Sequence, residues 1–174
     1  KDSTAVYPYQ DLQAPIFVVT SIVVSDGIGG TRSTSYHYSG GKSQLTGGGF
    51  LGFRQVDATD ALTGIKTSTV YRMDYPYHGL PTTVTKTQSN GRVLDSVTDT
   101  WSFTTYPDTA LPITANGSKH HFPSLTGMQE QIYELSGSLI TSINTTTAYD
   151  AYGDATTVTT ARPDNLNQTV TNTY

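Results

Sequence analysis

Residues 36–81 have the sequence YHYSGGKSQLTGGGFLGFRQVDATDALTGIKTSTVYRMDYPYHGLP. Tyr, Phe and Val recur among polar residues in short runs, and Gly, Asp and Pro separate these runs. Apolar or aromatic runs bounded by turn-forming residues are typical of β-strands joined by tight turns. We therefore interpret this stretch as a strand, a Gly turn, a tract of aromatic residues and glycine, a further strand, a turn, a strand and a corner bounded by proline.

The tract GGGFLGF at residues 47–53 is the most unusual part of this stretch. Its glycines surround Phe50 and Phe53. Glycine destabilises a folded backbone unless the position needs a positive φ or a very close approach of another segment. We expect a packing element here, in which neighbouring strands press against the glycines and both phenylalanine rings are largely buried.

On the N-terminal side, residues 16–25 are rich in β-branched residues and predict a buried strand. A turn at residues 26–30 leads into a strand over residues 31–38. A Gly-rich loop after a strand is also found in nucleotide-binding folds, but no helical pattern follows it here, so we exclude that interpretation.

On the C-terminal side, Asn90-Gly91 is the strongest short-range hairpin signal, between predicted strands at residues 82–87 and 93–106. Residues 107–123 contain three prolines and predict a surface loop. Further strands are predicted at residues 129–134, 139–149 and 155–161, and another begins at residue 168.

No helix of ordinary length is indicated anywhere in the sequence. Turn signals about every dozen residues predict an all-β fold, a strongly twisted antiparallel sheet built from successive hairpins. We treat residues 1–174 as a single segment with a central motif at 14–81, a hairpin and irregular loop at 82–125 and hairpin repeats at 126–174.

The central pattern resembles that of bacterial Rhs and YD-repeat proteins, most closely the repeat region in B-components of insecticidal toxin complexes. It is carried by Tyr36, Tyr38, Gly40, Gly41, Gly49, Phe50, Gly52, Phe53, Val56, Tyr71, Asp74, Pro76, Gly79 and Pro81. A second mark, the tyrosine-aspartate repeat, is carried by Tyr149, Asp150, Tyr152 and Gly153. The resemblance spans about residues 14–174, although residues 82–147 match only in the general character of their residues and not in a motif.

The resemblance implies a structural role. Such proteins wind their sheets into a hollow shell that encloses a toxic C-terminal region of the same polypeptide. The implied partners are therefore neighbouring repeats, the C-terminal toxin region and other toxin-complex subunits, and the implied location is secreted or on the bacterial cell surface. The self-cleaving junction of these families, with paired aspartates and a glycine, is not found in this sequence.

Composition excludes several classes of function. Charged residues are 14% of the chain and the formal net charge is −4, so there is no basic footprint for nucleic acid or an anionic membrane. No run approaches the roughly 20 apolar residues of a membrane helix. The chain has no cysteine, hence no disulfide or thiolate metal site. We expect an excised piece of a longer protein, with exposed strand edges that favour dimers.

No set of residues predicts a catalytic centre or a cofactor site. The four histidines, His37, His78, His120 and His121, are expected in exposed loops or strands. Asp57 and Asp60 are placed in a polar turn, where they cap backbone amides; a weak calcium site there is the alternative. No serine lies in a nucleophile-elbow pattern.

The tyrosine-aspartate repeat is interpreted structurally. Asp150 is expected to accept hydrogen bonds from backbone amides while Gly153 adopts a positive φ. Tyr149 and Tyr152 are expected to pack against neighbouring strands. A row of exposed aromatic side chains would instead stack on sugar rings, so a carbohydrate- or cell-surface-binding β module is the alternative function.

Overall fold

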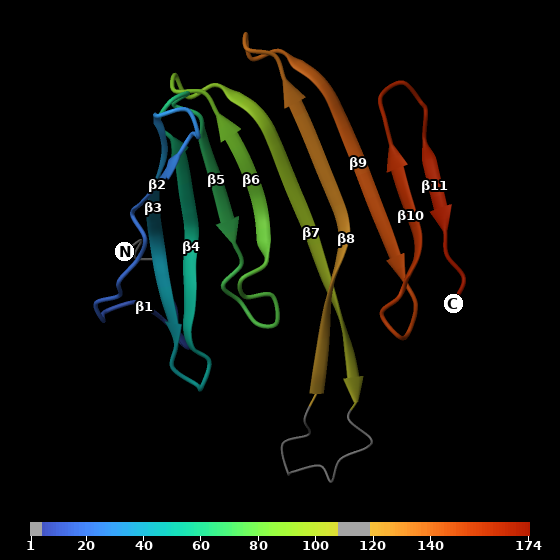
Figure 1. Cartoon of the computed structure of the whole chain (residues 1–174). Coiled ribbons are helices and arrows are strands. Elements are labelled where there is room, and N and C mark those ends of the chain that lie inside the picture. The colour runs from blue at the N-terminus through green and yellow to red at the C-terminus, as the bar shows by residue number, and fades with distance from the viewer. Residues whose placement is uncertain (1–4, 108–118) are drawn as a thin grey trace.

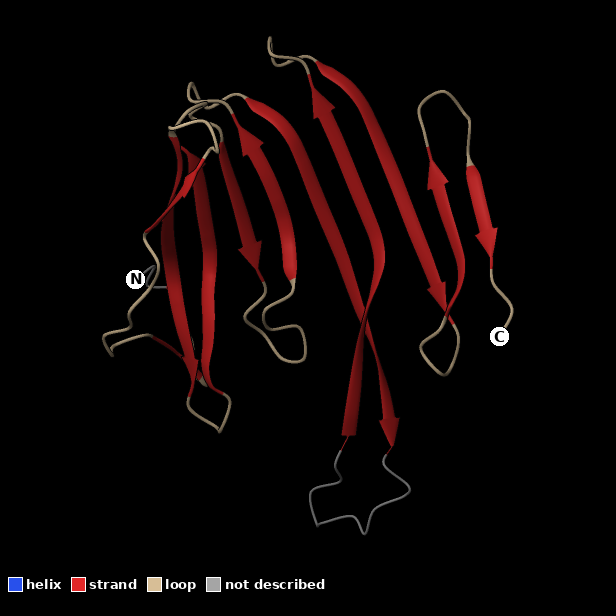
Figure 2. Ribbon diagram, in the orientation of Figure 1, coloured by secondary structure: helices blue, strands red, loops and turns tan. Residues whose placement is uncertain are grey.

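The computed structural model describes residues 5–107 and 119–174, and these form one antiparallel sheet of 11 strands (Figures 1 and 2). The strands are β1 Tyr9–Asp11, β2 Ser21–Ser25, β3 Thr31–Gln44, β4 Gly49–Asp60, β5 Lys66–Tyr71, β6 Pro81–Thr87, β7 Val93–Pro107, β8 Lys119–Tyr133, β9 Leu139–Tyr149, β10 Ala155–Ala161 and β11 Gln168–Thr171. The described residues contain no helix (Figure 2). The predicted all-β fold is confirmed.

The strands follow one another across the sheet as a meander. From β3 to β11 each strand pairs with the next in sequence, which confirms the predicted chain of hairpins. At the N-terminus the order changes, because β1 and β2 both pair with β3. β2 lies along residues 31–35 and β1 along residues 42–44, so two short strands share the outer edge of β3.

The Asn-Gly hairpin is formed where it was predicted. Gly91 has φ +84°, and the Gln88 amide donates a 2.8 Å hydrogen bond to the Arg92 carbonyl. Glycine reaches this φ without the clash that a Cβ atom would cause. The turn therefore sets the register between β6 and β7, in which Val84 lies opposite Val97.

Two neighbouring rows of paired residues differ in chemistry, and residues paired across strands share a face. One row of paired residues from β4 to β9 is Asp57, Ser68, Thr85, Ser96, Gln131 and Ser142. The neighbouring row, on the opposite face, is Val56, Thr69, Val84, Val97, Glu130 and Ile143. We call these the polar row and the valine-rich row; beside the valine-rich row, on the same face, Lys86 lies opposite Asp95.

Neither face is covered by a second layer of the described residues. Among them Tyr77 alone is a buried hydrophobic residue, with 9% of its surface exposed. Ordinary domains bury one face of each sheet against another layer. This sheet is instead held together laterally, by the ladder hydrogen bonds and by cross-strand side-chain contacts such as that between Lys86 Nζ and Asp95 Oδ2 at 3.2 Å.

The prediction of a buried strand at residues 16–25 is wrong. The strand comprises only Ser21–Ser25, and all of residues 16–25 are exposed. β2 lies at the edge of the sheet and nothing in the described structure covers it. A β-branched run indicates a strand but does not reveal whether a layer packs on it.

The predicted loop at residues 107–123 is also partly wrong. β7 and β8 extend as a long hairpin beyond the other strands (Figure 1), and Pro123 lies in β8 opposite Phe103. Proline fits this strand because β9 pairs with β8 only from Gly127 onward, so one side of Pro123 is a free edge. Residues 108–118, with the Asn116-Gly117 pair, lie outside the described residues.

Candidate functional site

The corner between β5 and β6 contains Tyr77, the one buried hydrophobic residue among the described residues. The Arg72 amide donates to the Leu80 carbonyl at 2.8 Å, and the Gly79 amide donates to the Arg72 carbonyl at 2.9 Å. Gly79 has φ +81° and Pro81 begins β6. The predicted proline-bounded corner is therefore present, and its two ends are hydrogen-bonded to each other.

An ion pair and an aromatic ring organise the corner from within. Arg72 Nε donates to Asp74 Oδ1 at 2.8 Å, and Arg72 Nη2 donates to Asp74 Oδ2. The hydrogen bonds from Arg72 hold the pKa of Asp74 below its usual value, against the opposing effect of burial. The Arg72 guanidinium also lies 3.7 Å from the centre of the Tyr77 ring. A single cation thus fixes both a carboxylate and a ring.

The corner docks on the β7–β8 hairpin through rings. We call Tyr75, Tyr77, Phe103 and His121 the corner cluster. Ring centres are 5.6 Å apart for Tyr77 and Phe103, 4.9 Å for Phe103 and His121, and 5.3 Å for Tyr75 and His121. Trp101 Nε1 adds a 2.7 Å hydrogen bond to the Pro81 carbonyl. The cluster is open on one side, since Tyr75 is 58% exposed.

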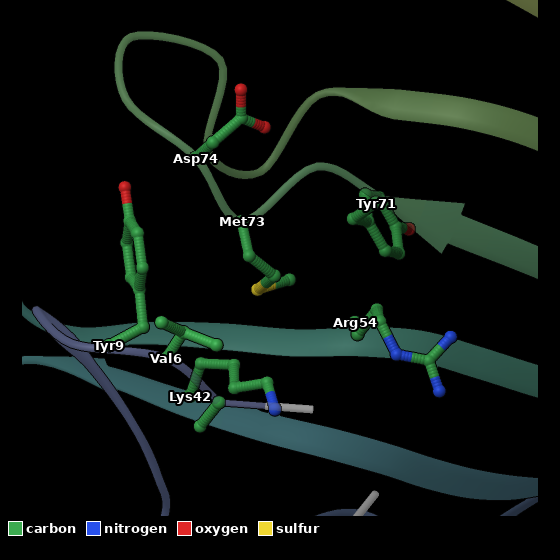
Figure 3. Close-up of a pocket in the computed structure, with 8 residues that line it drawn as sticks. Val6, Tyr9, Lys42, Arg54, Tyr71, Met73 and Asp74 are labelled. Carbon is green, nitrogen blue, oxygen red and sulfur yellow. The ribbon is translucent and has the colours of Figure 1, made fainter. Parts of the chain in front are cut away.

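A cavity of about 280 Å³ lies between the corner and residues 5–11, which we call the N-terminal arm (Figure 3). It is lined by Ala5, Val6, Tyr9, Lys42, Arg54, Tyr71, Met73 and Asp74. Met73 points from the loop toward β3 and β4 (Figure 3). The Tyr75 amide donates to the Tyr9 hydroxyl at 3.3 Å, so the arm and the corner are joined directly.

A buried ion pair lies beside this cavity. Lys42 Nζ is 2.6 Å from Asp11 Oδ1, and both side chains are more than nine-tenths buried. Because Asp11 lies opposite Lys42 in the β1–β3 ladder, the pair fixes where the arm attaches to the sheet. Lys42, which lines the cavity, therefore already has a carboxylate partner.

The tract GGGFLGF lies at the tip of the β3–β4 hairpin and is more exposed than predicted. Phe50 is 47% exposed, so its predicted burial is wrong, and Phe53 is half-buried, 5.0 Å from the Tyr38 ring. Gly49 and Gly52 have positive φ, at +64° and +97°, whereas the prediction was that neighbouring strands press against the glycines. No atom of another segment lies near either one, so close approach is not the reason for these two glycines.

The register explains the conformation of Gly52. Gly52 lies opposite Lys42 and Phe50 lies opposite Ser43, which leaves Leu51 as an extra residue in β4. Such a bulge needs a residue that tolerates an unusual backbone conformation. Close approach occurs instead at Gly41, where a Cβ atom would lie 3.3 Å from atoms of Leu12 and Phe53.

The tyrosine-aspartate turn follows the prediction in its backbone and departs from it at one ring. Asp150 Oδ1 accepts hydrogen bonds from the amides of Tyr152 and Asp154, at 2.8 and 3.0 Å, and Gly153 has φ +92°. The Tyr149 hydroxyl donates to the Leu125 carbonyl of β8 at 3.0 Å. Tyr152 is 88% exposed, so its predicted cross-strand packing is wrong. Tyr152 lies in the turn between β9 and β10, outside the paired residues of both strands.

The other predicted motif residues fall into two groups. Tyr36 and Tyr38 hold the segment before β2, because the Tyr36 amide donates to the Thr20 carbonyl and the Tyr38 hydroxyl to the Val19 carbonyl. Tyr71, Pro76, Gly79 and Pro81 belong to the corner or end the strands beside it. Of the second group, Tyr71 lines the cavity.

The carboxylates of β4 have structural partners. Asp60 accepts from the Thr63 amide and hydroxyl and from the Leu62 amide, and these bonds lower its pKa. Asp57 lies in β4 and not in the predicted turn. Burial raises the pKa of Asp57, but hydrogen bonds from Gln55 and Ser68, with Lys66 and His37 nearby, lower it overall. Within residues 5–107 and 119–174, no three His, Asp or Glu residues gather as metal ligands.

The residues that carry the packing are not among those predicted from the sequence. Tyr77 lies within the quoted corner motif but is not one of its predicted residues, and the pair of Asp11 and Lys42 is not predicted. The spacing of an aromatic residue inside a proline-bounded corner was an available signal for Tyr77. The ion pair joins residues far apart in sequence, and no local pattern indicates it.

Comparisons with known proteins assign no family to this chain. No family model, no curated protein and no solved structure matches this chain. The described part of the chain contains no helix long and apolar enough to cross a membrane.

Proposed function

We propose that this chain is a non-catalytic structural scaffold, a part of a β-shell that encloses a C-terminal toxin or effector region of the same polypeptide in a secreted or surface-displayed bacterial protein. The observation that carries the proposal is the open sheet of 11 strands with no second layer on either face of the described structure. An enzyme domain of this length ordinarily buries a core that holds its site rigid. A wall needs no such core.

The pattern of hydrogen bonding suits a wall. Every strand from β3 to β10 is paired on both sides over at least part of its length, so the ladder bonds run across the whole sheet. Side chains then remain free to face the two sides of the wall, as the polar row does on one side and the valine-rich row on the other. The resemblance to Rhs and YD-repeat proteins supports the same role through the corner motif and the tyrosine-aspartate turn.

The test measures, in the full-length polypeptide, whether the sheet protects the C-terminal region from protease. Val97→Pro would break the ladder in the middle of β7, where Val97 lies opposite Val84 on one side and Glu130 on the other. We expect limited proteolysis to spare the C-terminal region in the unchanged protein and to cleave it in Val97→Pro. Equal cleavage of that region in both proteins would contradict the proposal.

The matched control introduces proline where the backbone accepts it. Leu135 is the second residue of the β8–β9 turn, in which the Gly137 amide donates to the Glu134 carbonyl at 2.8 Å. Proline is favoured at this position of a turn. Leu135→Pro should therefore leave the protease pattern unchanged.

A carbohydrate- or cell-surface-binding module is the second candidate, favoured by the open side of the corner cluster. Tyr75 exposes a ring there beside His78, with ring centres 6.4 Å apart and nearly parallel planes. Exposed rings of this kind stack on sugars. Binding on a glycan array that is lost in Tyr75→Ala and kept in Tyr174→Ala, another exposed tyrosine, would support the module. Absence of binding by the unchanged chain would count against it.

A further inference from the structure

We propose that β2 is a self-association edge, through which two copies of this chain pair antiparallel about Val23 and continue the sheet from one copy into the other. This contact does not depend on the proposed shell. Three properties of residues 16–25 favour this contact: their exposure, the direction of their backbone groups and the symmetry of the strand sequence.

The first property is an exposed apolar surface without charge. The side chains concerned are Ile16, Phe17, Val18, Val19, Ile22, Val23 and Val24, with exposed fractions from 39% to 103%. No charged residue lies between Asp11 and Asp26. Natural edge strands usually carry lysine, proline or a bulge that prevents pairing with another chain. β2 has none of these protections.

The second property is the direction of the free backbone groups. The Tyr36 amide donates to the Thr20 carbonyl, and the Asp26 amide donates to the Gly30 carbonyl, so the even-numbered residues of this segment bond to β3. Alternation along an antiparallel pair then turns the N–H and C=O groups of Ser21, Val23 and Ser25 away from β3. These groups form a row at the outer edge of the sheet.

The third property is the symmetry of the strand Ser21–Ser25, whose sequence is SIVVS. Antiparallel pairing about Val23 places Val23 opposite the partner's Val23, Ser21 opposite the partner's Ser25 and Ile22 opposite the partner's Val24. Each outward residue would exchange both backbone hydrogen bonds with its counterpart. Each apolar side chain would meet an apolar side chain, and the two serines would meet each other.

The opposite edge of the sheet is a weaker competitor. β11, Gln168–Thr171, has the sequence QTVT, and Val170 is its one apolar residue. Pairing of β2 with β11 would be head-to-tail and would generate open filaments. A symmetric β2 contact stops at a dimer, because it occupies the β2 edge of both chains and leaves no β2 edge free for a third.

The first experiment measures molar mass by light scattering during gel filtration over a range of concentrations. Val23→Lys would place two ammonium groups opposite each other, and since Val23 is 62% exposed the monomer can accommodate the longer side chain. We expect the unchanged chain to pass from monomer to dimer as concentration rises and Val23→Lys to stay monomeric. Val170→Lys, the same change on β11, should dimerise like the unchanged chain.

The second experiment tests the register and does not depend on the stability of the lysine variant. Paired residues at this type of position have Cα atoms about 5.5 Å apart, within the range of a disulfide. The chain has no native cysteine, so Val23→Cys should give a disulfide-linked dimer on oxidation. Val24→Cys, one residue along and on the other face, should not.

Several results would overturn the proposal. A chain that remains monomeric at every concentration excludes the contact. Dimers that survive Val23→Lys but disappear in Val170→Lys would assign association to β11. Filaments that are lost in both variants would indicate head-to-tail pairing, and equal crosslinking of Val23→Cys and Val24→Cys would exclude the register.

Discussion

The Arg72 guanidinium lies 3.7 Å from the centre of the Tyr77 ring, while the same group forms two hydrogen bonds with Asp74. This places the one buried hydrophobic side chain of the described residues beneath a cation that a carboxylate holds in position. Cation–π contacts of this kind stabilise by about 0.5–2 kcal/mol. Single substitutions in the corner should therefore lower the stability of this sheet.

Tyr77→Ala should lower the free energy of unfolding by about 3 kcal/mol. The substitution removes a buried ring together with its contacts to Arg72 and Phe103, at the lower end of the range for aromatic truncations because the site is open on one side. Tyr77→Phe keeps the ring and serves as the control, with an expected change within about 0.5 kcal/mol. Urea unfolding curves of the two variants with equal midpoints would contradict this account of the corner.

The two phenylalanines of the GGGFLGF tract should differ. Phe53 is half-buried and contacts both Tyr38 and Phe50, so Phe53→Ala should destabilise by about 2 kcal/mol. Phe50 is an exposed residue, and Phe50→Ala should destabilise by less than about 1 kcal/mol. Thermal melts would show the order. A larger loss in Phe50→Ala would mean that the tip of the hairpin is packed differently in solution.

Gly52→Val should destabilise through the backbone alone. Gly52 has φ +97° and no neighbouring segment within 4 Å, so a side chain has room, but a β-branched residue is strained at this φ by about 1–3 kcal/mol. Gly52→Asn should be milder, since asparagine visits positive φ more readily. If chemical denaturation found Val and Asn equally tolerated, the bulge would not require a positive φ.

Acid should weaken the corner through Asp74. Its folded pKa is below the unfolded value, so the Arg72–Asp74 pair contributes stability above the unfolded pKa of about 3.9 and loses it as pH falls through the folded pKa. The side chain is half exposed, so the contribution should be below about 1 kcal/mol. The difference in unfolding free energy between the unchanged chain and Asp74→Asn should be smaller at pH 3 than at pH 7. An equal gap at both values would refute the linkage.

Asp99 should behave in the opposite sense. Desolvation raises its pKa, so the ionised form opposes folding and stability decreases as pH rises through the folded pKa. Asp99 lies in β7 opposite Met128 of β8. Asp99→Asn should therefore raise the melting temperature slightly at pH 7, by the equivalent of less than about 0.5 kcal/mol, and leave it unchanged at pH 3. A variant that is less stable at pH 7 would show that the charge is favourable.

The strands and turns could be predicted from the sequence because their signals are local. Alternation of Val, Trp and Phe with polar residues determined β7, and Asn90-Gly91 determined the hairpin before it. Asp150 and Gly153 indicated their turn for the same reason, since hydrogen bonds to adjacent amides and a positive φ involve only a few neighbouring residues. The proline-bounded corner belongs to this class.

Burial and pairing between distant residues were decided only by the tertiary structure. Phe50 and residues 16–25 have the composition of a core, yet they are exposed because no second layer of the described chain covers the sheet. Tyr77 is buried because the corner folds onto β7 and β8. Asp11 and Lys42 form a buried pair across 31 positions because β1 returns to the edge of β3. A sequence pattern determines which residues can form a strand, but burial depends on what packs against that strand, and this requires contacts between distant segments.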